Sequence, residues 1–160
     1  GLEARGMLHC VYTQNIDLLH QKAGSRKVYE LHGSPAHHHC LRCRKEFGYA
    51  EIAPRVLAGE VPHCPCGGVI KPDIVFYGES LDSDLLDQAF RDMEEAELLL
   101  VLGSSLTVQP AASLPLATRS GGGRIVIVNA QPTPLDGYAT LHYDDLFKVF
   151  DDLEHRLAKL

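Results

Sequence analysis

The sequence contains no tryptophan, only two methionines, and aromatic side chains at 7% of its 160 positions. It also lacks any run of about eighteen apolar residues, the length that a membrane-spanning helix needs. Basic residues are in the minority, because 15 lysines and arginines stand against 21 aspartates and glutamates. The net charge of −6 argues against a nucleic-acid surface, which needs a clustered basic face. We therefore expect neither a membrane nor a nucleic acid among its partners.

The remaining composition is that of an ordinary globular protein, with 45% apolar and 22% charged residues. A chain of this length can bury a core of its own. No basic segment leads into an apolar one near residue 1, so no signal peptide is visible. We predict one main domain that carries a small appendage.

Four of the five cysteines form two close pairs separated by about twenty residues, a spacing typical of a zinc ribbon. Paired thiols of this kind favour a metal site over a disulfide framework, and they predict a reducing, cytoplasmic location. The second pair is one residue shorter than the usual C-x-x-C, so His63 or His39 could supply a ligand instead. We interpret His37–His39 otherwise as a solvated run. The predicted ligands are Cys40, Cys43, Cys64 and Cys66.

Strand and helix patterns alternate along most of the chain, which predicts an α/β fold with a parallel sheet. Residues 37–70 interrupt this alternation and are too few for a separate core, so a metal would stabilise them. We predict a Rossmann-like domain over 1–36 and 71–160 and a zinc-binding module over 37–70. The expected strands are 7–13, 28–32, 97–102, 124–128 and 141–143, and the expected helices are 18–23, 82–95, 110–120 and one that begins after Asp144 or Asp145.

Polar residues follow the first two predicted strands, at the edge where parallel sheets bind ligands. Gln14, Asn15 and Asp17 come after the first strand, and Asp17 or Asn15 can also cap the next helix. His32 closes the second strand, which Gly33-Ser34-Pro35 is expected to end. A histidine in such a place can exchange protons near neutral pH.

A second candidate site follows the apolar strand 97–102, which we expect to be buried on both faces. Gly103, Ser104 and Ser105 come next, and such a turn before a helix can hold a phosphate through N–H groups and hydroxyls. By itself this signal is weak, since such turns are more often plain connections. Asn129 ends the strand 124–128.

Five motifs occur in one order along the chain: Tyr12–Asp17, Glu30–Ser34, the two cysteine pairs, Lys71–Glu79 and Gly103–Leu106. This set resembles the sirtuins, the NAD-dependent protein lysine deacylases. The resemblance covers the chain from about Leu8 to the terminal helix. It implies a Rossmann-like parallel sheet with helices on both faces and a small inserted zinc-ribbon module.

The resemblance also implies a role for each candidate residue. His32 would be the general base, and Asn15 and Asp17 would line the nicotinamide end of the NAD site together with Gln14. Gly103, Ser104 and Ser105 would contact the phosphates and ribose, Asn129 would contact the adenosine ribose, and four cysteines would hold Zn²⁺. The residues implied to border the acyl-lysine substrate are Val75, Phe76 and Gly78.

The implied reaction removes acyl groups from protein lysine side chains and yields nicotinamide and O-acyl-ADP-ribose. The family carries a glycine-rich phosphate loop well upstream of Gln14, and none of the residues before Gln14 fits it. We therefore expect a chain truncated at its amino end, with little activity alone and self-association through an incomplete sheet. The alternatives are a non-catalytic remnant that binds zinc and ADP-ribose or peptide, and an enzyme of NAD-dependent ADP-ribosyl transfer.

Overall fold

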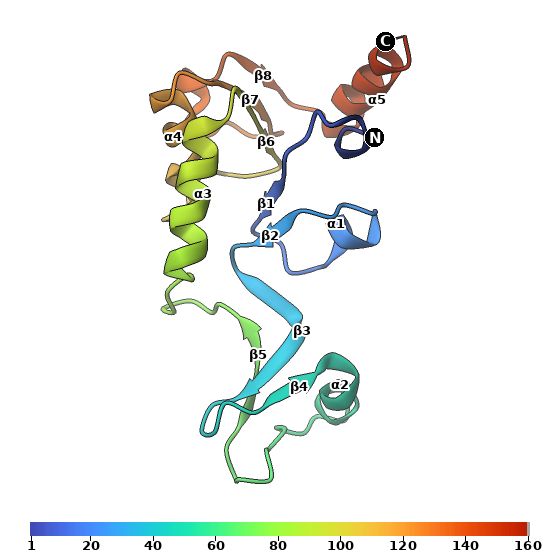
Figure 1. Ribbon diagram of the computed structural model, residues 1–160, viewed down its shortest axis with the longest axis vertical. Helices are drawn as coiled ribbons and strands as arrows, with labels where there is room; N and C mark the ends of the chain where they lie inside the picture. Colours follow the sequence, from blue (N-terminus) through green and yellow to red (C-terminus); the bar gives the residue numbers. More distant parts are fainter. Residues whose placement is uncertain (160) are drawn as a thin grey trace. The chain divides into compact units, whose positions relative to one another are not determined.

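The computed structural model describes residues 1–159, which form two compact units (Figure 1). One unit spans residues 2–82, and the other begins at Ser83 and includes Gly1. The division predicted from the sequence, with 37–70 as a separate module, stays a prediction. No helix among residues 1–159 has the length and apolar character that a membrane crossing requires.

The first unit opens with a parallel strand pair, as the sequence predicts. A 3₁₀ turn, η1 (Glu3–Arg5), precedes β1 (Val11–Thr13), and α1 (Leu19–Lys22) connects β1 to β2 (Val28–Glu30). The two strands lie side by side with Val11 opposite Val28 (Figure 1). Both are shorter than predicted. The Asp17 carboxylate accepts a hydrogen bond from the Leu19 N–H at 2.9 Å, so Asp17 rather than Asn15 holds the start of α1.

The prediction that Gly33-Ser34-Pro35 ends a strand is wrong. A long strand, β3 (Gly33–Cys40), begins at Gly33, because its positive φ of 75° lets the chain turn and re-enter a sheet. The interpretation of the three histidines as a solvated run is also wrong for His38, which lies in β3 and is buried. Burial lowers the pKa of the His38 imidazole, and the charge of Asp73 opposes that effect.

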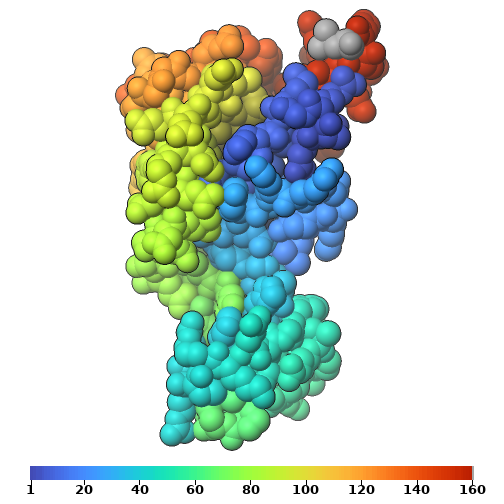
Figure 2. Space-filling view, in the orientation of Figure 1, coloured from blue at the N-terminus to red at the C-terminus, as the bar shows by residue number. Residues whose placement is uncertain are grey.

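The strand β3 is the middle of an antiparallel sheet with the order β4-β3-β5. Its neighbours are β4 (Glu46–Gly48) and β5 (Ile70–Ile74), and α2 (Tyr49–Leu57) follows β4. In Figure 2 the atoms of residues 33–74, coloured from cyan to green, form a lobe, called here the β3–β5 lobe. On α2, Ile52 is buried, whereas Val56 and Leu57 are exposed. The lobe has a core made of Cys40, Phe47, Ile52, Cys64 and Ile70.

The second unit is built on a parallel three-stranded sheet with the order β6-β7-β8. Its buried core comes mainly from the strands and from the loop residues that pack against them: Val101, Leu106, Ala112, Ile125, Ile127 and Leu135. The elements are α3 (Ser83–Glu95), β6 (Leu98–Leu102), η2 (Ala111–Ser113), α4 (Leu114–Ser120), β7 (Arg124–Val128), η3 (Asp136–Tyr138), β8 (Leu141–Tyr143) and α5 (Leu146–Leu157).

Two details of this unit differ from the prediction. The strand β6 pairs with β7 alone among the described residues, and Leu98 is 50% exposed, so it is not buried on both faces. The chain after Pro110 forms a 3₁₀ turn first, and α4 begins only at Leu114. The predicted cap of α5 is confirmed, because the Asp145 carboxylate accepts the Lys148 N–H at 3.0 Å.

Candidate active site and metal centre

His32 lies just after β2, where strand pairing brings it to the end of β1. The Leu31 N–H donates to the Thr13 carbonyl at 2.9 Å, which extends the parallel pair by one bond. The next residue, His32, places Nδ1 3.0 Å from the carbonyl oxygen of Gln14. A carbonyl can only accept, so Nδ1 is the donor and the other ring nitrogen, Nε2, is left with a lone pair when the ring is neutral.

The structure brings Gln14 to His32 through the Gln14 backbone. Asn15 and Asp17 follow on the same loop and are exposed. One Asp17 oxygen is engaged by the start of α1, which is the capping role that the sequence already suggested. Capping uses one oxygen only, so the carboxylate keeps accepting capacity for a ligand.

Residues 75–79, which follow β5, contact the backbone of His32. The Val75 N–H donates to the His32 carbonyl at 2.9 Å, which ties the first of the three predicted substrate residues to the candidate base. Phe76 and Glu79 then close a turn through two hydrogen bonds of 2.9 Å. Gly78 has a positive φ of 89° within that turn, and the Phe76 ring is half exposed.

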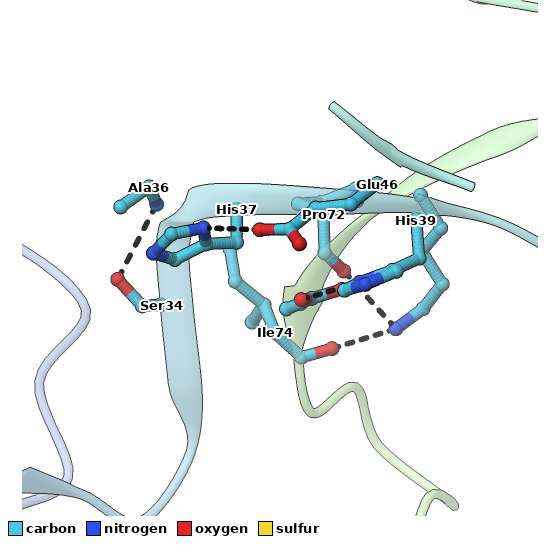
Figure 3. Close-up of polar contacts among 9 residues, drawn as sticks. Ser34, Ala36, His37, His39, Glu46, Pro72 and Ile74 are labelled. Carbon is cyan, nitrogen blue, oxygen red and sulfur yellow. Dashed lines mark hydrogen bonds and ion pairs between the residues drawn. The ribbon is translucent and has the colours of Figure 1, made fainter. Parts of the chain in front are cut away.

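Lys71 fixes this turn from β5. Its Nζ lies 2.7 Å from the Ile74 carbonyl and 2.9 Å from the Glu79 carboxylate, and 4.5 Å from the centre of the Phe76 ring. Figure 3 shows the bonds that reach the Ile74 and Pro72 oxygens. The N–H of Phe76 and the Lys71 ammonium lower the pKa of the Glu79 carboxyl. These contacts hold the turn from Phe76 to Glu79 in place.

Two histidines of β3, His37 and His39, contact carboxylates on the same sheet. His37 Nδ1 lies 2.9 Å from the Glu46 carboxylate, a pair labelled in Figure 3. His39 Nδ1 lies 2.7 Å from the Asp73 carboxylate. In both rings Nδ1 is therefore already engaged by a carboxylate of the same sheet.

In the second unit, Gly103 and Asn129 line one hollow of about 540 Å³. Gly103 has a positive φ of 56°, and its N–H donates to the Val128 carbonyl at 2.9 Å. The Asn129 side-chain amide donates to the Gln131 carbonyl at 2.7 Å, so its Oδ1 remains an acceptor. The sequence interpretation missed the other wall, since nothing local marks it as a site. That wall is Ala130, Asp144, Asp145, Leu146, Phe147 and Lys148.

Ser104 and Ser105 follow Gly103 but are not lining residues of that hollow. The Ser104 hydroxyl accepts the Leu106 N–H at 3.3 Å, and the Ser105 hydroxyl lies 2.8 Å from that of Thr107. The helix that would complete a phosphate cradle begins later, at Leu114. Only the turn itself is available to a phosphate here.

The four predicted metal ligands form one cluster. Their sulfur atoms all lie within 4.8 Å of one another, with 3.5 Å between Cys40 and Cys66 and 3.6 Å between Cys43 and Cys64. Tetrahedral zinc with bonds of about 2.3 Å holds its sulfurs about 3.8 Å apart, so the cluster fits Zn²⁺. Neither His39 nor His63 belongs to the group. His63 Nδ1 instead contacts the Val61 carbonyl at 2.8 Å.

The backbone around the cluster favours a thiolate at Cys40. The Cys43 N–H contributes most, against the opposing effect of burial, and lowers the pKa of the Cys40 thiol to about 6. The Arg42 N–H also points to this sulfur, at 3.4 Å. Zinc binds thiolates, so this loop is arranged for a cation.

A sequence model of the Sir2 family matches residues 1–110. The chain belongs to the Sir2 family. An NAD-dependent protein deacetylase of Thermotoga maritima is 48% identical over 144 residues, which cover 89% of this chain and 58% of that relative. NAD-dependent protein deacylase 1 of Archaeoglobus fulgidus is 45% identical over 135 residues, which cover 84% and 54%. This Sir2-family chain thus spans little more than half the length of these curated relatives.

Solved structures of the Sir2 family match over nearly the whole chain. Sir2Tm bound to a propionylated peptide has a TM-score of 0.93 at 44% identity, covering 98% of this chain and 67% of that one. Sir2 with a p53 peptide and NAD⁺ has a TM-score of 0.91 at 44% identity, covering 99% and 66%. The predicted Rossmann-like fold is confirmed by this likeness.

Proposed function

We propose that this chain carries the acyl-lysine and NAD sites of an NAD-dependent protein lysine deacylase. The observation that carries the proposal is the His32 ring, whose Nδ1 is held by the Gln14 carbonyl while Nε2 keeps its lone pair. An imidazole in this state is a general base suited to neutral pH. Relatives named NAD-dependent protein deacetylase and deacylase support the same reaction class.

In this reaction NAD supplies the ribose carbon that takes the acyl oxygen as nicotinamide leaves. His32 Nε2 would then accept a proton from a ribose hydroxyl, whose oxygen attacks the acyl carbon of this adduct. The bond from that carbon to the lysine nitrogen breaks, the nitrogen takes up a proton and leaves as the free amine, and one water adds to the acyl carbon, so the acyl group remains on ADP-ribose. The Asn129 Oδ1 accepts from hydroxyls of the adenosine part, since its amide nitrogen is already occupied by Gln131. Gly103 lines the same hollow and would meet the neighbouring part of NAD.

The substrate peptide would pair with the backbone beside Val75, as an added strand. Two observations support this place. The Val75 N–H is bonded to the His32 carbonyl, so the peptide would lie beside the base. Phe76 and the fully exposed Tyr77 also offer apolar surface to an acyl-lysine side chain. Zinc at the four cysteines would hold the β3–β5 lobe together and take no part in proton transfer.

We also propose a reducing, cytoplasmic location. Cys40, Cys43, Cys64 and Cys66 are arranged as a group of metal ligands rather than as disulfides, which suits such a location.

The test uses the protein at its natural length, NAD and an acetyl-lysine peptide, with nicotinamide and O-acetyl-ADP-ribose as the measured products. His32→Ala should lower turnover by roughly 10²–10⁴-fold, the usual contribution of a general base. His37→Ala is the matched control, because His37 is exposed and its ring contacts the Glu46 carboxylate. Equal turnover in both variants would refute the assignment of His32. Transfer of ADP-ribose to protein, without loss of the acetyl group, would favour ADP-ribosyl transfer instead.

A further inference from the structure

One peptide group, between Gln14 and Asn15, is hydrogen-bonded at both of its ends. Its carbonyl oxygen lies 3.0 Å from His32 Nδ1. Its N–H, which belongs to Asn15, donates to the hydroxyl oxygen of Thr13 at 3.1 Å. The hydroxyl of Thr13 and the ring of His32 are therefore hydrogen-bonded to opposite ends of the same peptide group.

Thr13 is well placed to fix that plane. It is the last residue of β1 and is 7% exposed. Its own carbonyl accepts the Leu31 N–H at 2.9 Å, so the parallel strand pair holds its backbone. A threonine hydroxyl that accepts the N–H two residues ahead makes a local turn, and it offers that N–H a partner at the point where the sheet ladder ends.

The peptide group is rigid, so an interaction at its N–H also sets the direction of its carbonyl. If the plane rotated, the Asn15 N–H would leave Thr13 and the Gln14 oxygen would leave the His32 ring. The carbonyl cannot donate, so the bond exists only while Nδ1 carries the proton. Which ring nitrogen of a histidine is protonated depends on the hydrogen bond that the other one makes.

We propose that Thr13 is a positioning residue: its hydroxyl orients the Gln14–Asn15 peptide so that neutral His32 carries its proton on Nδ1. Nε2 then keeps the lone pair that a general base needs. The effect of this tautomer on turnover rests on the proposed function. The assignment of the tautomer rests only on the two hydrogen bonds. The competing explanation is that Thr13 acts only as a buried β-branched residue of β1, a role that valine would fill equally well.

The experiment compares Thr13→Val, which keeps the shape and loses the acceptor, with Thr13→Ser, which keeps the acceptor. Thr118→Val is the control, because Thr118 is a buried threonine of α4 in the other compact unit. Long-range ¹⁵N–¹H NMR spectra at about pH 8, where imidazoles are neutral, report the tautomer directly. Hydrogen exchange reports the Asn15 N–H.

The expected spectrum of the unaltered protein has a protonated Nδ1 and an unprotonated Nε2 at His32. Thr13→Val should give a mixture of both tautomers and faster exchange at Asn15, and Thr13→Ser should restore the original state. In the deacylation assay, Thr13→Val should lower kcat by about 2- to 10-fold, the worth of one net hydrogen bond, with little change in the KM for peptide.

A protonated Nε2 in the unaltered protein would overturn the proposal, and this result does not require any variant to fold. An unchanged tautomer in folded Thr13→Val would overturn it as well. If the tautomer shifts as expected while His32→Ala remains fully active, Thr13 still positions the ring and the proposed function has failed. The two failures are therefore distinguishable.

Discussion

Gly33 lies against the backbone carbonyl of Asp73 so closely that a Cβ at position 33 would overlap the carbonyl oxygen. The two residues sit near the start of β3 and the end of β5, with Gly33 opposite Ile74 in the register. Gly33 also has a positive φ of 75°. His32 immediately precedes Gly33, and its carbonyl accepts the Val75 N–H. The close approach of Gly33 to Asp73 therefore fixes the position of the His32 backbone.

Gly33→Ala should destabilise the first unit by about 2–5 kcal/mol, since both the left-handed backbone and the overlap oppose a side chain. Urea unfolding measures the change. Gly59→Ala is the matched control, because Gly59 has a similar φ of 81° and open space around it. It should cost only the backbone part, about 1–2 kcal/mol. Equal losses in the two variants would show that the overlap with Asp73 is relieved at no cost.

Zinc should be present at one ion per chain, because the four sulfurs are already at tetrahedral spacing. Elemental analysis of protein purified without added metal measures it, and a strong chelator should expose the core around Phe47 and Ile52. Cys66→Ser should lose most of the metal, whereas His63→Ala, outside the four-cysteine group, should keep it. Less than about half an ion per chain, with four titratable thiols, would contradict a structural zinc site.

Thr118→Val should stabilise the second unit. Thr118 is 0% exposed, and its hydroxyl oxygen has no hydrogen-bond partner within residues 1–159. A buried hydroxyl without a partner carries a desolvation penalty, so its removal should raise the free energy of unfolding by about 1 kcal/mol. Thermal unfolding of Thr118→Val and Thr118→Ser separates the hydroxyl from the methyl group. A lower melting temperature for the valine variant would show that the hydroxyl is bonded after all.

Asp136 should stabilise the loop before β8 at neutral pH and lose that effect in acid. The Thr133 hydroxyl and N–H lower the pKa of the Asp136 carboxyl. A carboxyl whose pKa is lower in the folded protein stabilises it above the unfolded pKa of about 3.9, and the effect fades as the pH falls through the folded value.

Asp136→Asn should therefore lower the melting temperature near pH 7, and the difference from the unaltered protein should shrink as the pH drops below about 4. Asp87→Asn, at an exposed position on α3, serves as the control and should change little at any pH. A melting difference for Asp136→Asn that stays constant from neutral to acid pH would show that charge is not the cause.

The sequence by itself determined the order of most elements and the metal ligands. The alternation of apolar runs with helical stripes predicted β6, β7, β8, α3 and α5, because burial of one face leaves a local period. The helix predicted between the strands that end near 13 and begin near 28 indicated a parallel pair. The four cysteines were identifiable because thiols at such spacing have few other uses. The capping carboxylate of Asp145 was equally local.

Other features depend on residues that are distant in the chain. The sequence marked Gln14 as polar, yet its contact with His32 is made by the backbone carbonyl, which every residue possesses. The burial of His38 follows from the antiparallel pairing of β3 with β5, more than thirty residues later. Asp144 joins Gly103 in one hollow for the same kind of reason. Local patterns record which face of an element is apolar, whereas only packing decides which backbone groups and side chains meet.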